Sequence, residues 1–186
     1  MKNKNTKIKK KKLDSLPKIR RRILKSWSEN VRTRDGFTCT YCGVKSGTES
    51  KFNPGTKTKC DAHHILQKEI KDCPLKYEIM NGETLCSSCH KFNGEHSAHK
   101  SPIVFYDWFR KKYPDRYDFI LKNSGIRVDL DNRFVLEEIE QILLKKESLN
   151  LEKLKEIERN NPRQKKEERK EERGTLFDPD SSSSSD

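Results

Sequence analysis

Cys39-Thr40-Tyr41-Cys42 and Cys86-Ser87-Ser88-Cys89 are two Cys-x2-Cys motifs in one short chain. Two thiolates three positions apart in a tight turn can bind the same ion, and two such pairs complete a tetrahedral zinc site. The four cysteines therefore predict a closed, structural Zn²⁺ site. The other two cysteines, Cys60 and Cys73, are expected to be ordinary reduced thiols, with a role in metal binding as the alternative.

The composition explains why a structural metal would help this chain to fold. Of its 186 residues, 31% are hydrophobic and 38% are charged. A core this lean is marginal by burial alone, and a metal that binds only the folded chain supplements it. We find no apolar segment of secretory-signal or transmembrane length. The expectation is a cytoplasmic protein, not a secreted one.

The net positive charge is concentrated near the N-terminus. Residues 1–34 contain 14 Lys and Arg and 2 acidic residues, whereas the remaining residues contain 27 of each kind. Such a basic segment is typical of a chain that binds a polyanion. Nucleic acid is the favoured polyanion over an anionic membrane surface, and we expect no membrane partner.

Composition and apolar periodicity divide the chain into five segments. The basic arm, residues 1–16, and the tail, residues 174–186, hold few apolar side chains and are expected to be disordered. Between them we predict a basic amphipathic helix at 17–34, a zinc-containing core at 35–100 and a helical extension at 101–173. The C-terminal helices or the tail could dock a partner protein, and a tail without a partner is the alternative.

The helix predicted at 17–34 has an apolar stripe and a basic surface. Ile19, Ile23, Trp27 and Val31 recur every four residues, and basic side chains lie off that stripe. We expect the stripe to pack on the zinc-containing core and the basic side chains to contact a phosphate backbone; a solvated basic surface is the alternative. The predicted nucleic-acid-binding residues are Arg20, Arg21, Arg22, Lys25, Arg32 and Arg34.

Turn signals and periodicity predict the remaining elements. The run 61–66 is typical of a short strand, and Asn81-Gly82 is a turn signal before a helix that begins at the second cysteine motif. Two amphipathic helices are expected after Pro102 and Pro114. A charged helical pattern extends from Phe134 to about residue 173, with an interruption at Pro162. The predicted fold class is α+β.

Two adjacent histidines lie on the predicted strand. Successive side chains of a strand point to opposite faces, so His63 and His64 cannot ordinarily bind one ion together. A metal ligand and a general base are two separate roles that imidazoles can fill. His90 could complete the metal site from the following helix, and the side-chain amide of Asn81 could brace the loop that carries the base.

Taken together, these motifs resemble the HNH endonucleases, in particular small phage-borne and homing-type members with two Cys-x2-Cys motifs. The resemblance covers roughly residues 30–95. The matching segments are Arg34-Asp35-Gly36-Phe37-Thr38-Cys39-Thr40-Tyr41-Cys42-Gly43, Ala62-His63-His64-Ile65 and Asn81-Gly82-Glu83-Thr84-Leu85-Cys86-Ser87-Ser88-Cys89-His90. The order and spacing of the three segments are specific, whereas each alone would be weak.

The resemblance implies a fold and a set of roles. The fold would be a small ββα-metal core held together by Zn²⁺, with flanking helices. The substrate would be double-stranded DNA in preference to RNA, and the location would be the cytoplasm of a bacterium or of a phage-infected host cell. His64 would be the general base that deprotonates water, and Asn81 would orient its loop. His63 and His90 would hold a catalytic Mg²⁺ or Mn²⁺ that bridges the scissile phosphate and stabilises the 3′ leaving oxygen.

A third ligand for the catalytic ion is not evident from the motif. In some relatives it follows the last histidine by three or four positions, where this chain has Asn93 and Gly94. Asn93 is a weak candidate and Gly94 offers no ligand atom. We expect His96 and His99 to be surface histidines, with metal binding as the alternative.

Two alternatives to a nuclease remain open at the level of sequence. A non-catalytic zinc module that binds DNA would also need the four cysteines and the basic arm, but would not need His63, His64, Asn81 and His90 in this order. An accessory subunit of a DNA-packaging or restriction machine could use the charged helices for docking, and this is compatible with nuclease activity.

Overall fold

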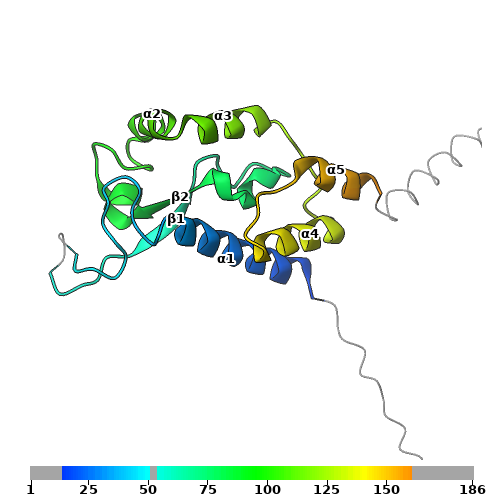
Figure 1. Ribbon diagram of the computed structural model, residues 1–186, viewed down its shortest axis with the longest axis horizontal. Helices are drawn as coiled ribbons and strands as arrows, with labels where there is room; N and C mark the ends of the chain where they lie inside the picture. Colours follow the sequence, from blue (N-terminus) through cyan, green and yellow to red (C-terminus); the bar gives the residue numbers. More distant parts are fainter. Residues whose placement is uncertain (1–13, 51–53, 161–186) are drawn as a thin grey trace, which may run out of the picture.

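The computed structural model of the protein describes residues 14–50 and 54–160. A two-stranded ribbon lies between two layers of helices, with α2 and α3 over one face and α1 and α4 over the other (Figure 1). The elements are α1 (Leu16–Arg34), β1 (Cys60–His64), η1 (Pro74–Tyr77), η2 (Ile79–Asn81), β2 (Gly82–Cys86), η3 (Ser88–Phe92), α2 (Pro102–Lys112), α3 (Pro114–Asn123), α4 (Arg133–Leu144) and α5 (Leu151–Arg159). The α+β class is as predicted.

Helix α1 carries the apolar stripe that its sequence predicts. Ile19, Ile23 and Val31 are at most 1% exposed, and Trp27 is also buried. Burial of an isoleucine side chain contributes roughly 1.5–3 kcal/mol to the free energy of unfolding. The stripe packs on the ribbon and on α4, and the side chain of Asn30 donates to the Leu143 carbonyl of α4 at 2.7 Å. Helix α1 is therefore a central element and not an appended arm.

The two strands pair antiparallel in a register that fixes which side chains share a face. His63 is opposite Glu83, and His64 is opposite Gly82. Gly82 has no room for a side chain on the α1 face, because an added Cβ atom would lie 2.3 Å from Val31 and 2.9 Å from Trp27. His64 therefore faces α1, and His63 and Glu83 face α2 and α3.

The first cysteine motif forms a short hairpin. Thr38 and Lys45 pair across it, and Gly43 at its end has φ 76°. That left-handed conformation favours glycine, since a Cβ atom strains it. Further along the chain, η3 begins within the second motif and includes Cys89. It is a π-helical turn, where the sequence predicted an ordinary helix through His90 and Lys91.

The helices after residue 100 pack into the same core as the ribbon. Phe105 and Phe109 of α2 are fully buried, and Ile139 and Leu143 of α4 are also buried. The charged pattern after Phe134 forms two helices, α4 and α5, separated at residues 145–150. Residues 161–186, which include Pro162, the end of the predicted helical pattern and the tail, lie outside the described residues, as do residues 1–13 of the arm. Among the described helices, none combines the length and apolar character needed to cross a membrane.

Candidate metal centres and the ribbon between them

The four cysteines of the two motifs converge. The sulfur atoms of Cys39, Cys42, Cys86 and Cys89 all lie within 4.8 Å of one another, and all six cysteines of the chain are free thiols. The Sγ atoms of Cys42 and Cys86 are 3.7 Å apart. A tetrahedral zinc with sulfur ligands at about 2.3 Å requires sulfurs about 3.8 Å apart. The cluster fits a structural metal such as zinc.

Three histidines form a second cluster. Ring nitrogens of His63 on β1, His90 on η3 and His99 in the following loop all lie within 4.8 Å of one another. Such a group can hold one cation. His99 is exposed, as expected of a surface histidine, and its ring nitrogens also lie close enough to those of His63 and His90 for the metal-binding alternative. Backbone contacts hold the loop in place: the His99 amide donates to the His90 carbonyl at 3.2 Å.

The other two residues considered as third ligand lie elsewhere. The Asn93 side chain accepts hydrogen bonds from the backbone amides of Glu95 and His96, at 2.8 and 3.1 Å, and so caps the turn after η3. His96 stacks on Tyr41 with ring centroids 4.6 Å apart, and its Nε2 lies 3.9 Å from Cys89 Sγ. His96 thus borders the cysteine cluster and not the histidine cluster.

His64 occupies a different environment from its neighbour. Its ring stacks on Trp27, with centroids 3.7 Å apart and planes 11° from parallel. Its Nε2 lies 2.9 Å from the carbonyl oxygen of Lys76. A carbonyl only accepts hydrogen bonds, so Nε2 carries the proton of the neutral ring and Nδ1 keeps a free lone pair. This tautomer can accept a proton at Nδ1.

Asn81 braces the loop that follows His64. Its Oδ1 accepts from the Leu66 amide at 2.6 Å, and its Nδ2 donates to the carbonyls of Leu66 and Leu75 at 3.1 and 2.9 Å. Asn81 is fully buried. The Lys76 carbonyl that holds His64 comes directly after this braced segment, so the amide of Asn81 helps to fix the His64 ring.

Burial keeps these imidazoles neutral. It lowers the pKa of His63 from 6.5 to about 3, with further lowering by His90 and His99. Burial also lowers the pKa of His64 to about 4, against the raising effect of its bond to Lys76, and lowers that of His90 to about 4. Neutral rings offer lone pairs, which both a metal ligand and a base require.

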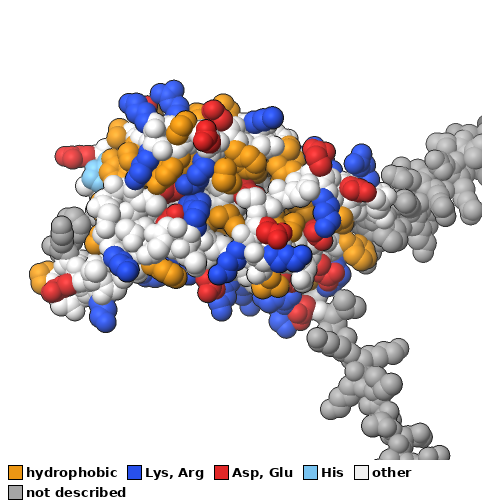
Figure 2. All heavy atoms as spheres, in the orientation of Figure 1, with side chains coloured by type: hydrophobic (Ala, Val, Ile, Leu, Met, Phe, Trp, Pro, Cys, Tyr) orange, Lys and Arg blue, Asp and Glu red, His pale blue; other side chains and the backbone are white. Residues whose placement is uncertain are grey.

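The basic residues predicted to bind nucleic acid are used in different ways. Arg20 is paired with Asp131, Arg22 with Asp14 and Glu140, and Arg34 with Asp35 and Glu83. The Arg32 guanidinium donates to the Ser28 carbonyl at 3.1 Å. Within the described part of the chain, Arg21 and Lys25 are exposed and have no such partner. Lys and Arg side chains line the lower edge of the molecule over α1 (Figure 2).

The fold and the two clusters define a mixed α+β protein with one site suited to a structural metal and a second, histidine-lined site. Protein-family models, curated proteins and solved structures yield no match to this chain. What the protein does has to be argued from its own residues.

Proposed function

We propose that this protein is a metal-dependent DNA endonuclease of the HNH type. The observation that carries the proposal is that the two clusters share elements, because η3 carries both Cys89 and His90, and the ribbon carries His63 and Cys86. Cys39 and Cys42 come from the hairpin at 38–45, and His99 comes from the loop after η3. The cysteines hold the turn that carries His90, and the ribbon carries His63 and His64. A non-catalytic zinc module needs only the cysteine cluster.

The histidine cluster is the proposed cation site. His63, His90 and His99 would hold the ion, so the ligand set is larger than the pair inferred from the resemblance. Imidazole suits transition-metal ions, whereas Mg²⁺ prefers oxygen ligands. Mn²⁺, the other ion expected from the resemblance, also favours oxygen ligands, although it binds nitrogen more tightly than Mg²⁺ does, and Ni²⁺ and Zn²⁺ suit three imidazoles better than either. A bound cation would polarise a phosphoryl oxygen and offset charge on the leaving oxygen.

His64 is the proposed general base. The Lys76 carbonyl fixes Nε2 as the protonated nitrogen, and Nδ1 accepts the proton of the attacking water. Trp27 covers one face of the ring and so limits its rotation. Asn81 acts indirectly, by holding the loop whose Lys76 carbonyl accepts the hydrogen bond from His64.

Arg21 and Lys25 are the proposed phosphate contacts on α1. Both are exposed, and their guanidinium and ammonium groups make no ion pair within the described part of the chain. Each phosphate contact contributes close to one unit to the salt dependence of DNA affinity. The double variant Arg21→Ala/Lys25→Ala should therefore reduce the slope of log K against log salt by about 2. Arg22→Ala is the control, because Arg22 already pairs with Asp14 and Glu140.

Relaxation of supercoiled plasmid tests the function. The purified chain is incubated with Mn²⁺, Ni²⁺ or Mg²⁺, beside an EDTA control and the His64→Ala variant, with zinc counted on the same samples. We expect relaxation that requires the added ion and is lost in His64→Ala, with one zinc retained per chain. A protein that keeps its zinc and retards the plasmid without cutting it under any ion would instead be a DNA-binding module.

The role of His99 has its own test. Calorimetric titration with Ni²⁺ of protein that holds one zinc per chain should show one further site, weakened by His99→Ala more than about tenfold, the lower limit for loss of even an outer-shell partner. His96→Ala is the matched control, since His96 lies outside the histidine cluster. Equal Ni²⁺ affinity in the His99→Ala variant and the wild type would remove His99 from the ligand set.

A further inference from the structure

The backbone on both sides of Asn81 is held by two guanidinium groups. Arg116 of α3 donates to the carbonyls of Met80, at 3.0 Å, and of Gly82. Arg34 at the end of α1 donates to the Gly82 carbonyl at 2.8 Å, and it also reaches the carbonyl of Ile79 at 2.8 Å. Arginines from two helices in opposite layers therefore bind carbonyl groups of the same short segment, residues 79–82.

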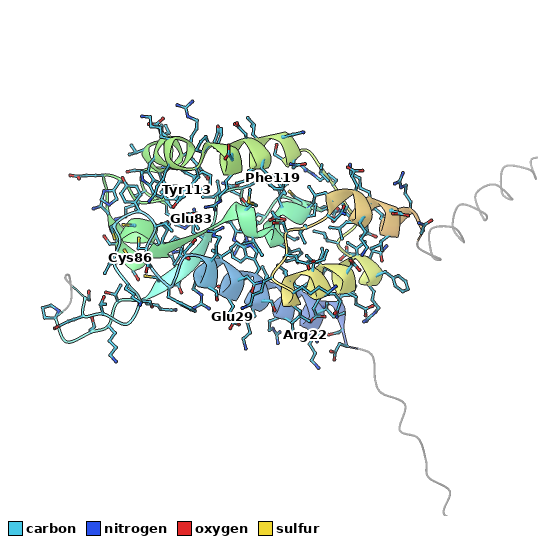
Figure 3. The ribbon with its side chains drawn as sticks, viewed as in Figure 1. Arg22, Glu29, Glu83, Cys86, Tyr113 and Phe119 are labelled. Carbon is cyan, nitrogen blue, oxygen red and sulfur yellow. The ribbon has the colours of Figure 1, made fainter. Side chains whose placement is uncertain are left out.

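A buried carboxylate lies between the two guanidiniums. Glu83 is fully buried, with Oε2 2.7 Å from Arg116 and 3.4 Å from Arg34. Figure 3 shows Glu83 between the ribbon and the α2–α3 pair, below Tyr113. The Arg116 guanidinium also lies over the rings of Phe109 and Tyr113, at 5.1 and 4.8 Å from their centroids. The groups are packed as well as paired.

Added stability alone does not explain this buried network of charged side chains. Removing charged groups from water is costly, and a buried ion pair is weak evidence for added stability. Buried polar networks can instead specify one conformation. The conformation fixed here is that of residues 79–83, which includes Asn81.

Fixing Asn81 has a consequence further along the chain. Its side chain holds Leu66 and Leu75, and the next carbonyl, that of Lys76, accepts from the His64 ring. Hydrogen bonds, joined by the peptide links from Met80 to Asn81 and from Leu75 to Lys76, thus connect Arg116 on α3 to the ring of His64 on β1. Each step is a direct contact between described residues.

We propose that Arg116 and Arg34, paired through Glu83, form a clamp that positions Asn81 and, through it, His64. Arg116 and Arg34 are positioning residues, and helix α3 belongs to the catalytic unit although it lies outside the HNH motifs. The role of the clamp in turnover rests on the proposed nuclease function. The effect of the clamp on the His64 ring is independent of that function.

The tautomer of His64 tests the clamp without any substrate. Nitrogen NMR of the full-length, zinc-loaded, histidine-labelled chain distinguishes Nε2–H from Nδ1–H rings, and the signal lost in His64→Gln assigns His64. Arg116→Lys keeps the charge beside Glu83 but cannot span two carbonyls. We expect a single Nε2–H tautomer in the wild type and a mixture in Arg116→Lys. The control is Arg110→Lys, because Arg110 is exposed and pairs with Asp107. An unchanged His64 tautomer in Arg116→Lys overturns the proposal.

Plasmid relaxation with Mn²⁺ supplies the second readout. Arg116→Lys should lower kcat on the order of 10²-fold, the cost of a small misplacement of a reacting group, with little change in KM. A raised KM with unchanged kcat would make Arg116 a DNA contact and overturn the clamp. If Arg116→Lys fails to fold, Glu83→Gln replaces it in both measurements, with the same expected directions. If the wild type relaxes no plasmid with any ion, the nuclease proposal fails, and the NMR result still decides whether the clamp holds His64.

Discussion

Two adjacent histidines differ because of what packs against each of them. His63 meets the edge of the Phe105 ring, at 5.5 Å between centroids, and shares a cluster with His90 and His99. His64 is stacked on Trp27 and bonded to a backbone carbonyl. The alternation of a strand separates the two rings, and the layers on either side of the ribbon give each ring its chemistry.

Acidification should reveal the burial of His64 as a loss of stability. The pKa of His64 is lowered from 6.5 to about 4, so between these values the unfolded chain binds a proton that the native protein does not. The free energy of unfolding therefore falls as the pH drops through this window and is unaffected by this group above about pH 7. Urea denaturation at about pH 7.5 and about pH 5 should show a larger loss for the wild type than for His64→Gln. Equal losses would mean that His64 is not buried as a neutral ring.

The buried amide of Asn81 should be costly to remove. Asn81→Ala leaves the Leu66 amide and the carbonyls of Leu66 and Leu75 without their partner. We expect a loss of roughly 1–3 kcal/mol in unfolding free energy for each group that water cannot reach. Urea denaturation measures it, with Asn93→Ala as the control because Asn93 is only partly buried and caps a surface turn. A variant as stable as this control would argue against a bracing role.

At the scale of elements, α1 packs on the face of the ribbon that carries His64. It supplies the Trp27 ring under His64, and the Trp27 indole donates to the Glu78 carbonyl at 2.9 Å. Its C-terminal Arg34 holds the start of β2. The close approach of α1 to β2 requires that position 82 be glycine.

Gly82→Ala should separate α1 from β2. The new methyl group would lie 2.3 Å from Val31 Cγ2 and 2.9 Å from Trp27 Cζ2, distances that force movement of a buried side chain or of the helix. Overpacking of this kind costs about 1–3 kcal/mol, and it should also disturb the His64 ring. Gly94→Ala is the control, because nothing lies within 4 Å of its added Cβ atom. Thermal unfolding of both variants measures this loss of stability.

At the scale of the molecule, the C-terminal helices complete the core. Helix α4 covers the stripe of α1, and the Glu78 carboxylate accepts from the Leu149 amide at 2.7 Å between α4 and α5. Burial raises the pKa of Glu78, against the lowering effect of its hydrogen bonds. A buried carboxylate committed to this junction ties the C-terminal helices to η2.

Truncation should show that the region of the cysteine and histidine motifs does not fold by itself. A chain ending at Ser124 lacks α4 and α5, so the part of the α1 stripe that packs on α4 becomes exposed. We expect it to show no cooperative thermal transition by circular dichroism. A chain ending at Asn160 keeps every described helix and should melt like the full-length protein. A cooperative transition in the shorter chain would make the motif region an independent domain.

Loss of one zinc ligand should have a similar global effect. Cys86→Ser removes a thiolate from the cysteine cluster, and binding of a structural metal is part of the folding free energy. We expect loss of zinc, by elemental analysis, together with loss of the cooperative transition. Cys73→Ser is the control, because Cys73 is buried but lies outside both clusters. If Cys86→Ser kept zinc and stability, the four-cysteine site would be refuted.

Local spacing in the sequence predicted much of this molecule. The two Cys-x2-Cys motifs predicted a four-cysteine cluster, and the four-residue period of Ile19, Ile23 and Trp27 predicted the buried stripe of α1. The alternation of His63 and His64 predicted that they face opposite ways. All of these follow from short-range geometry, since a turn, a helix or a strand fixes the directions of its own side chains.

Tertiary structure alone decided which partners those side chains meet. The path of the loop after η3 places His99 beside His63, 36 positions apart in the sequence. Arg34, whose contact with nucleic acid stays a prediction, reaches Glu83, 49 positions away. Arg116 reaches the Met80 carbonyl from 36 positions away. No local periodicity in the sequence encodes these long-range contacts, because they depend on how the layers of helices pack on the ribbon.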